Sequence, residues 1–272
     1  ADLIKPLITK KTKAVMVVHY AGQCCEMDKI AKLCKSKNLK LIEDSAETLG
    51  GTWKGKQAGS WGVGCFSFFP TKNITTGEGG MITCYDKSLF KKFKLMHAHG
   101  ISTHTFEREG TKNLPWEKIA KVAGHNFRLS NLLASIGFEQ LKKINTLNSK
   151  RRKSAKLYLK LIRKHDLPIE TPFEHPNAKH VYQTYAVRVD SKIRNKLLFF
   201  LRKKGIGASV HFTPPLHKHP YFAKRCVKRI SLRNAEILSR TMISLPMYSN
   251  IKKKEIEYIC KNLKIFFNKN KN

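Results

Sequence analysis

The order of apolar and polar residues near the start of the chain predicts a strand, a helix and a second strand. Residues 14–19 form a continuous apolar run, which is typical of a strand buried on both faces. Residues 27–38 have the spacing of an amphipathic helix, and residues 39–43 predict a second strand that ends on Asp44. We expect a right-handed parallel unit. Because ligands bind beyond the carboxyl ends of parallel strands, Asp44 is placed where chemistry is expected.

The pattern then changes along the chain. Residues 50–64 are glycine-rich and predict loops around a short hairpin, and a long helix is expected from Ser130 to about residue 164, with one break near 145–149. We predict two domains, an α/β domain over residues 1–150 and a smaller α+β domain over residues 151–272. The other expected elements are strands at 81–85, 182–189 and 208–212, helices at 87–98, 193–204, 232–242 and 255–267, and a polar loop at 100–125.

Composition adds a strong positive charge to this picture. The chain has 272 residues, and its 53 Lys and Arg residues against 19 Asp and Glu residues give a net charge of +34. Such a charge suggests nucleic acid or another polyanion as a partner. The basic residues are spread along the chain and concentrate on predicted helix faces, however, which also fits a solvated surface.

Cysteine usage and hydropathy point to a cytoplasmic protein without metal. The seven cysteines lack the paired spacing of a metal site, and their odd number without a signal peptide predicts reduced thiols. No apolar run reaches the ~20 residues that a membrane-spanning helix needs, so we expect no membrane contact.

One lysine differs from the others in its surroundings. Residues 64–69 form an apolar run that ends at Pro70, Lys72 follows, and a polar glycine-rich turn leads to the next apolar run at Met81. A lysine among apolar groups can keep its amine neutral, attack a carbonyl and form a Schiff base. A lysine that caps a turn with its amine in water would have the same local sequence. Spacing alone therefore leaves both interpretations open.

Several blocks of sequence, in this order, resemble one family. They are IEDSAETLGGTWKGKQAGSWG (42–62), CFSFFPTKNITTGEGGMI (65–82), GHNFRLSNLLASIG (124–137), and VHFTPPLH (210–217) with SLPMY (244–248). The family is that of the DegT/DnrJ/StrS nucleotide-sugar aminotransferases, which are pyridoxal 5′-phosphate (PLP) enzymes of the aspartate-aminotransferase fold. The resemblance covers essentially the whole chain. It implies an α/β fold, with residues 1–150 as part of the PLP-binding large domain and residues 151–272 as the small domain.

The resemblance also implies roles for single residues. Lys72 resembles the lysine that binds PLP as a Schiff base, Asp44 the carboxylate that pairs with the pyridine nitrogen, and Ser67 the serine that bonds the cofactor phosphate. Asn126 resembles an asparagine that reaches the phosphate from a neighbouring subunit. Glu47 stands near the cofactor ring where many relatives have Gln, which favours the perosamine-synthase-like branch. The alternatives are structural: a turn-capping Asp, a core Ser, a loop Asn and a Glu at a helix start.

Two histidines are weaker candidates. His211 and His217 fall in a segment that lies near the sugar-nucleotide site in the family, although histidines packed under a proline turn would look the same.

The family also has a segment before the first strand that cradles the phosphate at a helix N-terminus. This chain has no candidate for that segment, so we expect it to correspond to the C-terminal two-thirds of an enzyme.

The resemblance implies transfer of an amino group, with glutamate as the expected donor, to a 4-keto nucleotide sugar. It also implies a homodimer whose active site is shared between subunits. The retained Lys72 favours transamination, because relatives that dehydrate carry histidine there. The alternative is a basic, inactive relative that binds nucleic acid or another anionic polymer, for which the charge of +34 would account.

Overall fold

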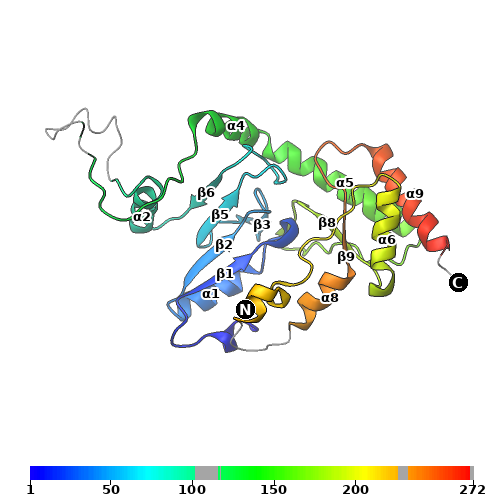
Figure 1. The fold of residues 1–272 in the computed structure, drawn as a ribbon, viewed down its shortest axis with the longest axis horizontal. Coiled ribbons are helices and arrows are strands. Elements are labelled where there is room, and N and C mark those ends of the chain that lie inside the picture. The colour runs from blue at the N-terminus through cyan, green and yellow to red at the C-terminus, as the bar shows by residue number, and fades with distance from the viewer. Residues whose placement is uncertain (102–115, 117, 226–231, 270–272) are drawn as a thin grey trace. The chain divides into compact units, whose positions relative to one another are not determined.

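The computed structural model describes residues 1–101, 116, 118–225 and 232–269, which Figure 1 draws as coloured ribbon. They form two compact units. The first comprises Ala1–His19, Cys25–Leu49 and Lys56–Ile144, and the second comprises Tyr20–Cys24, Gly50–Gly55 and Asn145–Asn272. Most of the loop expected at 100–125 lies outside the described residues.

The first unit is built on a four-stranded sheet with the order β1-β2-β5-β6. β1 pairs with β2 and β2 with β5 in parallel, whereas β5 and β6 are antiparallel, as the strand–helix–strand pattern predicts for its first part. The elements of this unit are β1 (Ala14–Val18), α1 (Met27–Ser36), β2 (Lys40–Asp44), β4 (Lys56–Gln57), β5 (Val63–Ser67), β6 (Gly80–Thr83), α2 (Lys87–His97), α4 (Asn131–Lys142) and a 3-10 turn, Lys5–Leu7.

The prediction that β1 is buried on both faces is wrong. Val17 is 7% exposed, but Met16 is 63% and Val18 51% exposed. Side chains alternate along a strand, so Val17 lies on one face of the sheet and Met16 and Val18 on the other. α1 contacts β2 and buries its own Met27 and Ile30. One face of this apolar strand is therefore packed while the other is exposed.

The second unit has a closed hydrophobic core around the antiparallel pair β8–β9. Tyr158 of α5, Leu197 of α6 and Leu263 of α9 are each fully buried in this core. The elements are β3 (Thr52–Trp53), α5 (Ile144–Lys164), β7 (Ala178–Lys179), β8 (Tyr185–Arg188), α6 (Ser191–Lys203), α7 (Pro220–Ala223), α8 (Arg233–Thr241), β9 (Met242–Leu245), α9 (Lys253–Lys269) and 3-10 turns at Tyr20–Gly22 and Leu216–Lys218.

A helix break and a predicted strand differ from the sequence predictions. The long helix starts after Ser130, whose hydroxyl accepts a hydrogen bond from Leu133 N at 3.3 Å as an N-cap should, but it breaks at Lys143 rather than at 145–149. The strand expected at 208–212 does not form. Only Ser209 makes an isolated bridge there, because Phe212 has a positive φ of 60° and prolines that lack an N–H follow.

Candidate active site

The ends of β2 and β5 place two predicted site residues on one face of the sheet. Asp44 is the register partner of Cys65, and Ser67 lies two residues further along β5. Paired residues of parallel strands share a face and alternate residues return to it, so Asp44 and Ser67 point to the same side. Asp44 Oδ1 accepts a hydrogen bond from Ala46 N at 3.1 Å, and Ser67 Oγ accepts one from Phe69 N at 3.3 Å. Both side chains thus also cap the turns that follow their strands.

Lys72 lies in a compact turn between β5 and β6. Its amide donates to Phe69 O at 3.0 Å, and the turn is closed where Phe68 N donates to Gly79 O at 2.9 Å. Gly79 has a φ of +137°, and a Cβ at this position would lie 2.8 Å from Leu129 Cδ1. Glycine is required here for both reasons. The backbone of Lys72 is consequently held by hydrogen bonds on both sides of the turn.

The side chain of Lys72 is paired with Glu47. Lys72 Nζ lies 3.6 Å from Glu47 Oε1, and the side chains are only 18% and 16% exposed. The sequence around Lys72 suggested aromatic and hydroxyl neighbours, but the fold adds a carboxylate from the segment after β2. The amine is therefore largely withdrawn from water and faces a negative charge.

On the opposite face, Glu43 is fully buried directly before Asp44. His19 Nε2 donates to Glu43 Oε2 at 3.1 Å, and Cys25 N donates to His19 Nδ1 at 3.2 Å, which places the ring proton on Nε2. Three backbone amides also donate to the carboxylate: Gly59 at 2.8 Å, Trp61 at 2.7 Å and Gly62 at 2.8 Å.

These contacts fix the charge of Glu43. Burial tends to raise the pKa of this carboxyl, but the hydrogen bonds from His19 and the backbone amides outweigh burial and lower the pKa below its ordinary value. The sequence analysis missed this residue. The available signal was a carboxylate directly after the apolar residues Leu41 and Ile42 in a predicted strand. A buried charge is stable only when several partners bind it, so such a residue indicates a polar cluster.

The other predicted site residues, Asn126, His211 and His217, make hydrogen bonds to residues outside the group of Lys72, Glu47, Asp44 and Ser67. Asn126 forms an isolated bridge with Ala98, and its Oδ1 accepts a hydrogen bond from Arg128 Nε at 3.2 Å. In the second unit, His211 Nδ1 lies 2.6 Å from Ser244 Oγ and His217 Nε2 lies 3.1 Å from Glu236 Oε1.

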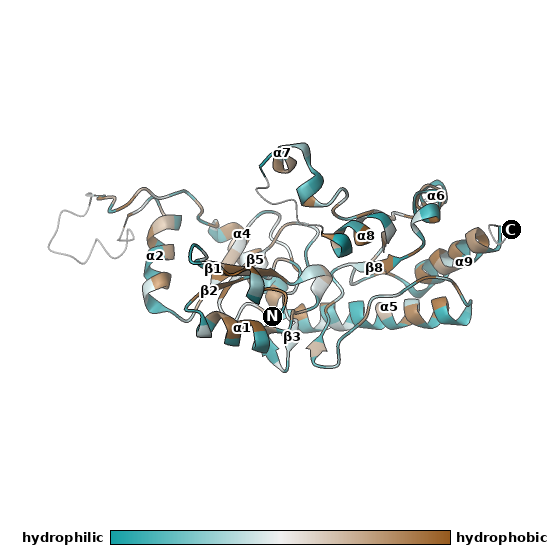
Figure 2. Cartoon of the chain, turned by 90° about the horizontal axis from the view of Figure 1, so that it is seen from below, coloured by the Kyte–Doolittle hydropathy of each residue, from teal (hydrophilic) through white to brown (hydrophobic). Residues whose placement is uncertain are grey.

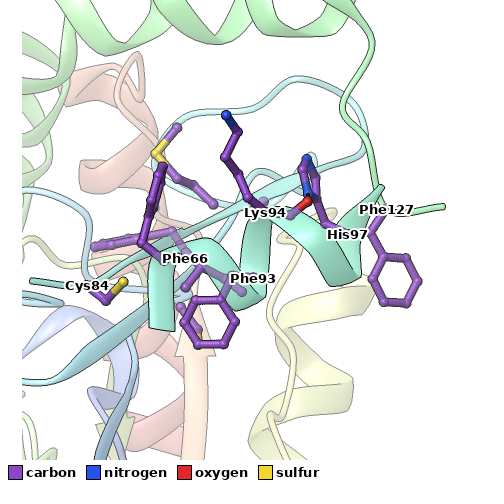
Figure 3. A pocket seen from close by; sticks show the side chains of 11 residues that line it. Phe66, Cys84, Phe93, Lys94, His97 and Phe127 are labelled. Atoms are coloured by element: carbon purple, nitrogen blue, oxygen red, sulfur yellow. Dashed lines mark hydrogen bonds between the residues drawn. The ribbon is translucent and has the colours of Figure 1, made fainter. Parts of the chain in front are cut away.

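An apolar pocket of about 500 Å³ lies beside β6 and α2 in the first unit, as Figure 3 shows. Its lining contains none of Lys72, Asp44, Glu47 and Ser67. The labelled side chains around it are those of Phe66, Cys84, Phe93, Lys94, His97 and Phe127.

The described ranges offer neither a metal site nor a membrane-spanning helix. They contain no group of three or more His, Cys, Asp or Glu side chains that could hold a metal ion. None of the helices described is both long and apolar enough to span a membrane.

The fold is that of solved sugar aminotransferases. PseC of Helicobacter pylori, an aminotransferase of pseudaminic acid biosynthesis, has a TM-score of 0.88 and 29% identity, over 98% of this chain and 70% of that one. The PLP form of the putative sugar aminotransferase Spr1654 of Streptococcus pneumoniae has a TM-score of 0.87 and 25% identity, over 98% of this chain and 71% of that one. The sequence profile of the DegT/DnrJ/EryC1/StrS aminotransferase family matches residues 1–264, and the chain belongs to this family.

Curated relatives include one whose name contains a nucleotide sugar. GDP-perosamine synthase of Escherichia coli O157:H7 is 34% identical over 97% of this chain and 68% of its own length. The uncharacterized protein MJ1066 of Methanocaldococcus jannaschii is 39% identical over 90% of this chain and 64% of its own length. The chain thus spans about two thirds of the length of the relatives it matches.

Proposed function

We propose that the chain carries the active-site lysine of a PLP-dependent aminotransferase that transfers an amino group to a 4-keto nucleotide sugar, with glutamate as the donor. The observation that carries this proposal is the position of Lys72, held in a turn after β5 with its amine beside Glu47. Family membership and the similarity to GDP-perosamine synthase support a sugar substrate, in amino-sugar or surface polysaccharide biosynthesis.

The residues at this strand edge fit three of the functional groups of PLP. An amine for the aldehyde, a carboxylate for the pyridine nitrogen and a hydroxyl for the phosphate are supplied by Lys72, Asp44 and Ser67. When bound, PLP withdraws electrons from the carbon that loses a proton. Asp44 would keep the proton on the ring nitrogen, and the Lys72 amine would take and return the proton at the substrate carbon.

The remaining site residues complete the proposal. Asn126 would reach the phosphate of a second copy in a homodimer, and His211 and His217 would contact the sugar nucleotide. Four apolar side chains of α4 are exposed and offer a surface for the second copy: Leu132 (74%), Ile136 (45%), Phe138 (62%) and Leu141 (46%). We place the enzyme in the cytoplasm. The family match favours this function over binding of an anionic polymer.

Reduction with borohydride in the presence of PLP tests the proposal. We expect peptide mapping to find the reduced cofactor on Lys72, and Lys72→Ala to lose this label. Lys142 is a matched control, because it also pairs with a carboxylate, Glu139, but its side chain is 54% exposed. Equal labelling of Lys72 and Lys142 would show that Lys72 has no special reactivity and would contradict the proposal.

A further inference from the structure

We infer that Glu47 is a positioning residue whose ion pair with the Lys72 amine restrains the reactivity of that amine as a nucleophile. The inference deepens the proposed function and rests on it for its place in the reaction. The geometry itself is a property of the chain: the carboxylate and the amine lie 3.6 Å apart in the same unit.

Burial distinguishes this pair from the other lysine–carboxylate pairs. Lys142 and Glu139 are closer, at 2.6 Å, but their side chains are 54% and 58% exposed, whereas those of Lys72 and Glu47 are 18% and 16% exposed. Water and salt weaken an exposed pair to a small net effect. A charge that has lost most of its water depends far more on its partner. Glu47 should therefore influence Lys72 more than Glu139 influences Lys142.

The neighbouring titratable groups have other partners or lie in water. Glu43 is occupied by His19 and by three backbone amides, on the opposite face of β2. Asp44 Oδ1 accepts the Ala46 amide, and Glu78, in the turn after Lys72, is exposed. Among the ion pairs found between described residues, Lys72 is paired with Glu47.

This arrangement also supplies a route for the proton that Lys72 must release. An ammonium ion has no lone pair, so Nζ has to lose one proton before it can bond to a carbonyl carbon. Glu47 Oε1, which lies 3.6 Å from Nζ, would accept that proton once the two side chains move to hydrogen-bond distance. As the new N–C double bond forms, the carbonyl oxygen leaves as water, and the proton returned by Glu47 balances the step. The carboxylate thus restrains the amine at rest and serves as its proton acceptor when a carbonyl arrives.

Competitive acetylation of the full chain with acetic anhydride at pH 7.5 tests the inference without cofactor. The rate at Lys72 is measured by mass spectrometry relative to Lys142 in the same sample. Glu47→Gln should speed acetylation of Lys72 by about tenfold, the change that corresponds to ~1.4 kcal/mol, because the amine is then released from its ion pair with the carboxylate. An unchanged or slower Lys72 in Glu47→Gln would overturn the inference.

Two further variants separate charge from structure. Glu47→Asp keeps the carboxylate and should leave Lys72 slow, within about twofold of the wild type on the scale where tenfold is ~1.4 kcal/mol. If Glu47→Asp accelerates Lys72 as much as Glu47→Gln does, lost packing rather than lost charge is the cause, and the inference fails. Glu139→Gln, the matched control, should leave the absolute acetylation rate of Lys72 unchanged; Lys142 cannot be the reference in this variant, because it has lost its own partner.

The same variants keep the inference and the proposed function distinguishable. Acetylation reports only on Lys72 and Glu47, whereas borohydride reduction with PLP reports on the cofactor site. Labelling of Lys72 by PLP without any effect of Glu47→Gln on acetylation would contradict the inference but not the proposed function. Faster acetylation in Glu47→Gln with no preference of PLP for Lys72 would do the reverse.

Discussion

The two units differ in how completely they bury their apolar side chains. In the second unit, Tyr158 and Leu197 are fully buried within one continuous core. In the first unit, Met16 is 63% and Ile82 52% exposed, although both belong to strands of the central sheet. Figure 2 shows β1 largely in brown, whereas α5 of the second unit has alternating brown and teal positions, as a helix with one buried side does.

The candidate chemistry lies in the unit that buries less. Lys72, Glu47, Asp44 and Ser67 all belong to the first unit. There, buried polar contacts take over part of the role that apolar packing has in the second unit, and Glu43 with its four hydrogen-bond donors is the main example. We therefore expect substitutions in the first unit to affect reactivity most, and substitutions in the second unit to affect stability most.

The largest effect is expected for Asp44→Asn. An amide cannot hold the proton on the ring nitrogen by charge, and loss of an electrostatic catalytic group costs about 10²–10³ in rate. The measurement is transamination by the holoenzyme with glutamate and a 4-keto nucleotide sugar. Asp166→Asn is the control, because Asp166 is exposed and has a positive φ of 47° that Asn tolerates equally well. Full activity in Asp44→Asn would mean that another carboxylate serves the ring.

The difference in burial can be tested with one substitution in each unit. Leu197→Ala leaves a cavity in the closed core and should lower the free energy of unfolding by about 2–5 kcal/mol. Met16→Ala removes a side chain that is mostly in water and should cost less than about 1 kcal/mol. Urea unfolding, combined with hydrogen exchange of each unit, gives both values. Equal costs would show that the exposed face of β1 is covered in solution, for instance by a second copy.

Sequence analysis predicted the parallel strands and the turn at Lys72 because both follow from local order along the chain. The apolar runs at β1 and β2 specify strands, and the glycines after Lys72 specify the turn. The exposure of Met16 and Val18 could not be predicted, since it depends on what covers each face of the sheet.

Contacts between residues that are distant in the sequence could not be predicted from the local pattern either. The pairing of Lys72 with Glu47 joins residues separated by three strands and the loops between them, and only the fold brings them to 3.6 Å. Glu43 was missed because its partners, His19 and three backbone amides, come from other segments of the chain. The strand expected at 208–212 failed for a local reason, the backbone at Phe212.

A pH effect of intermediate size is expected in the second unit. Burial lowers the pKa of His180 from 6.5 to about 4, although Glu174 opposes the shift. The unfolded chain then binds the extra proton between these values, so the stability contribution is full above pH ~6.5 and is lost as the pH falls towards 4. The loss is about 3 kcal/mol at ~1.4 kcal/mol per unit. Urea midpoints from pH 7.5 to 4.5 measure it.

His180→Phe is the variant for this measurement. It preserves a flat ring that can stack on Tyr182, as His180 does at a centroid distance of 4.0 Å, but it cannot be protonated. The variant loses the hydrogen bond from Tyr182 N to His180 Nδ1, so its absolute stability will be lower and only the slope with pH is informative. The slope should flatten between pH 6.5 and 4.5. An unchanged slope would place the titrating group elsewhere.

Among the substitutions of buried residues, the smallest and most local effect is expected for Glu43→Gln. The amide keeps the shape of the carboxylate but turns its NH2 group towards backbone amides that also donate, which leaves buried donors unsatisfied at a cost of about 1–3 kcal/mol. Because the pKa of Glu43 is lowered, its contribution is present above its ordinary value and is lost as the pH falls below it. At pH 7 the variant should speed hydrogen exchange at Gly59, Trp61 and Gly62, while amides in α9 keep their protection. Glu170→Gln, which disrupts an exposed pair with Arg188, should change neither region. Unaltered protection at the three amides would mean that the carboxylate does not hold this loop, and the contrast between polar and apolar stabilisation of the two units would have to be abandoned.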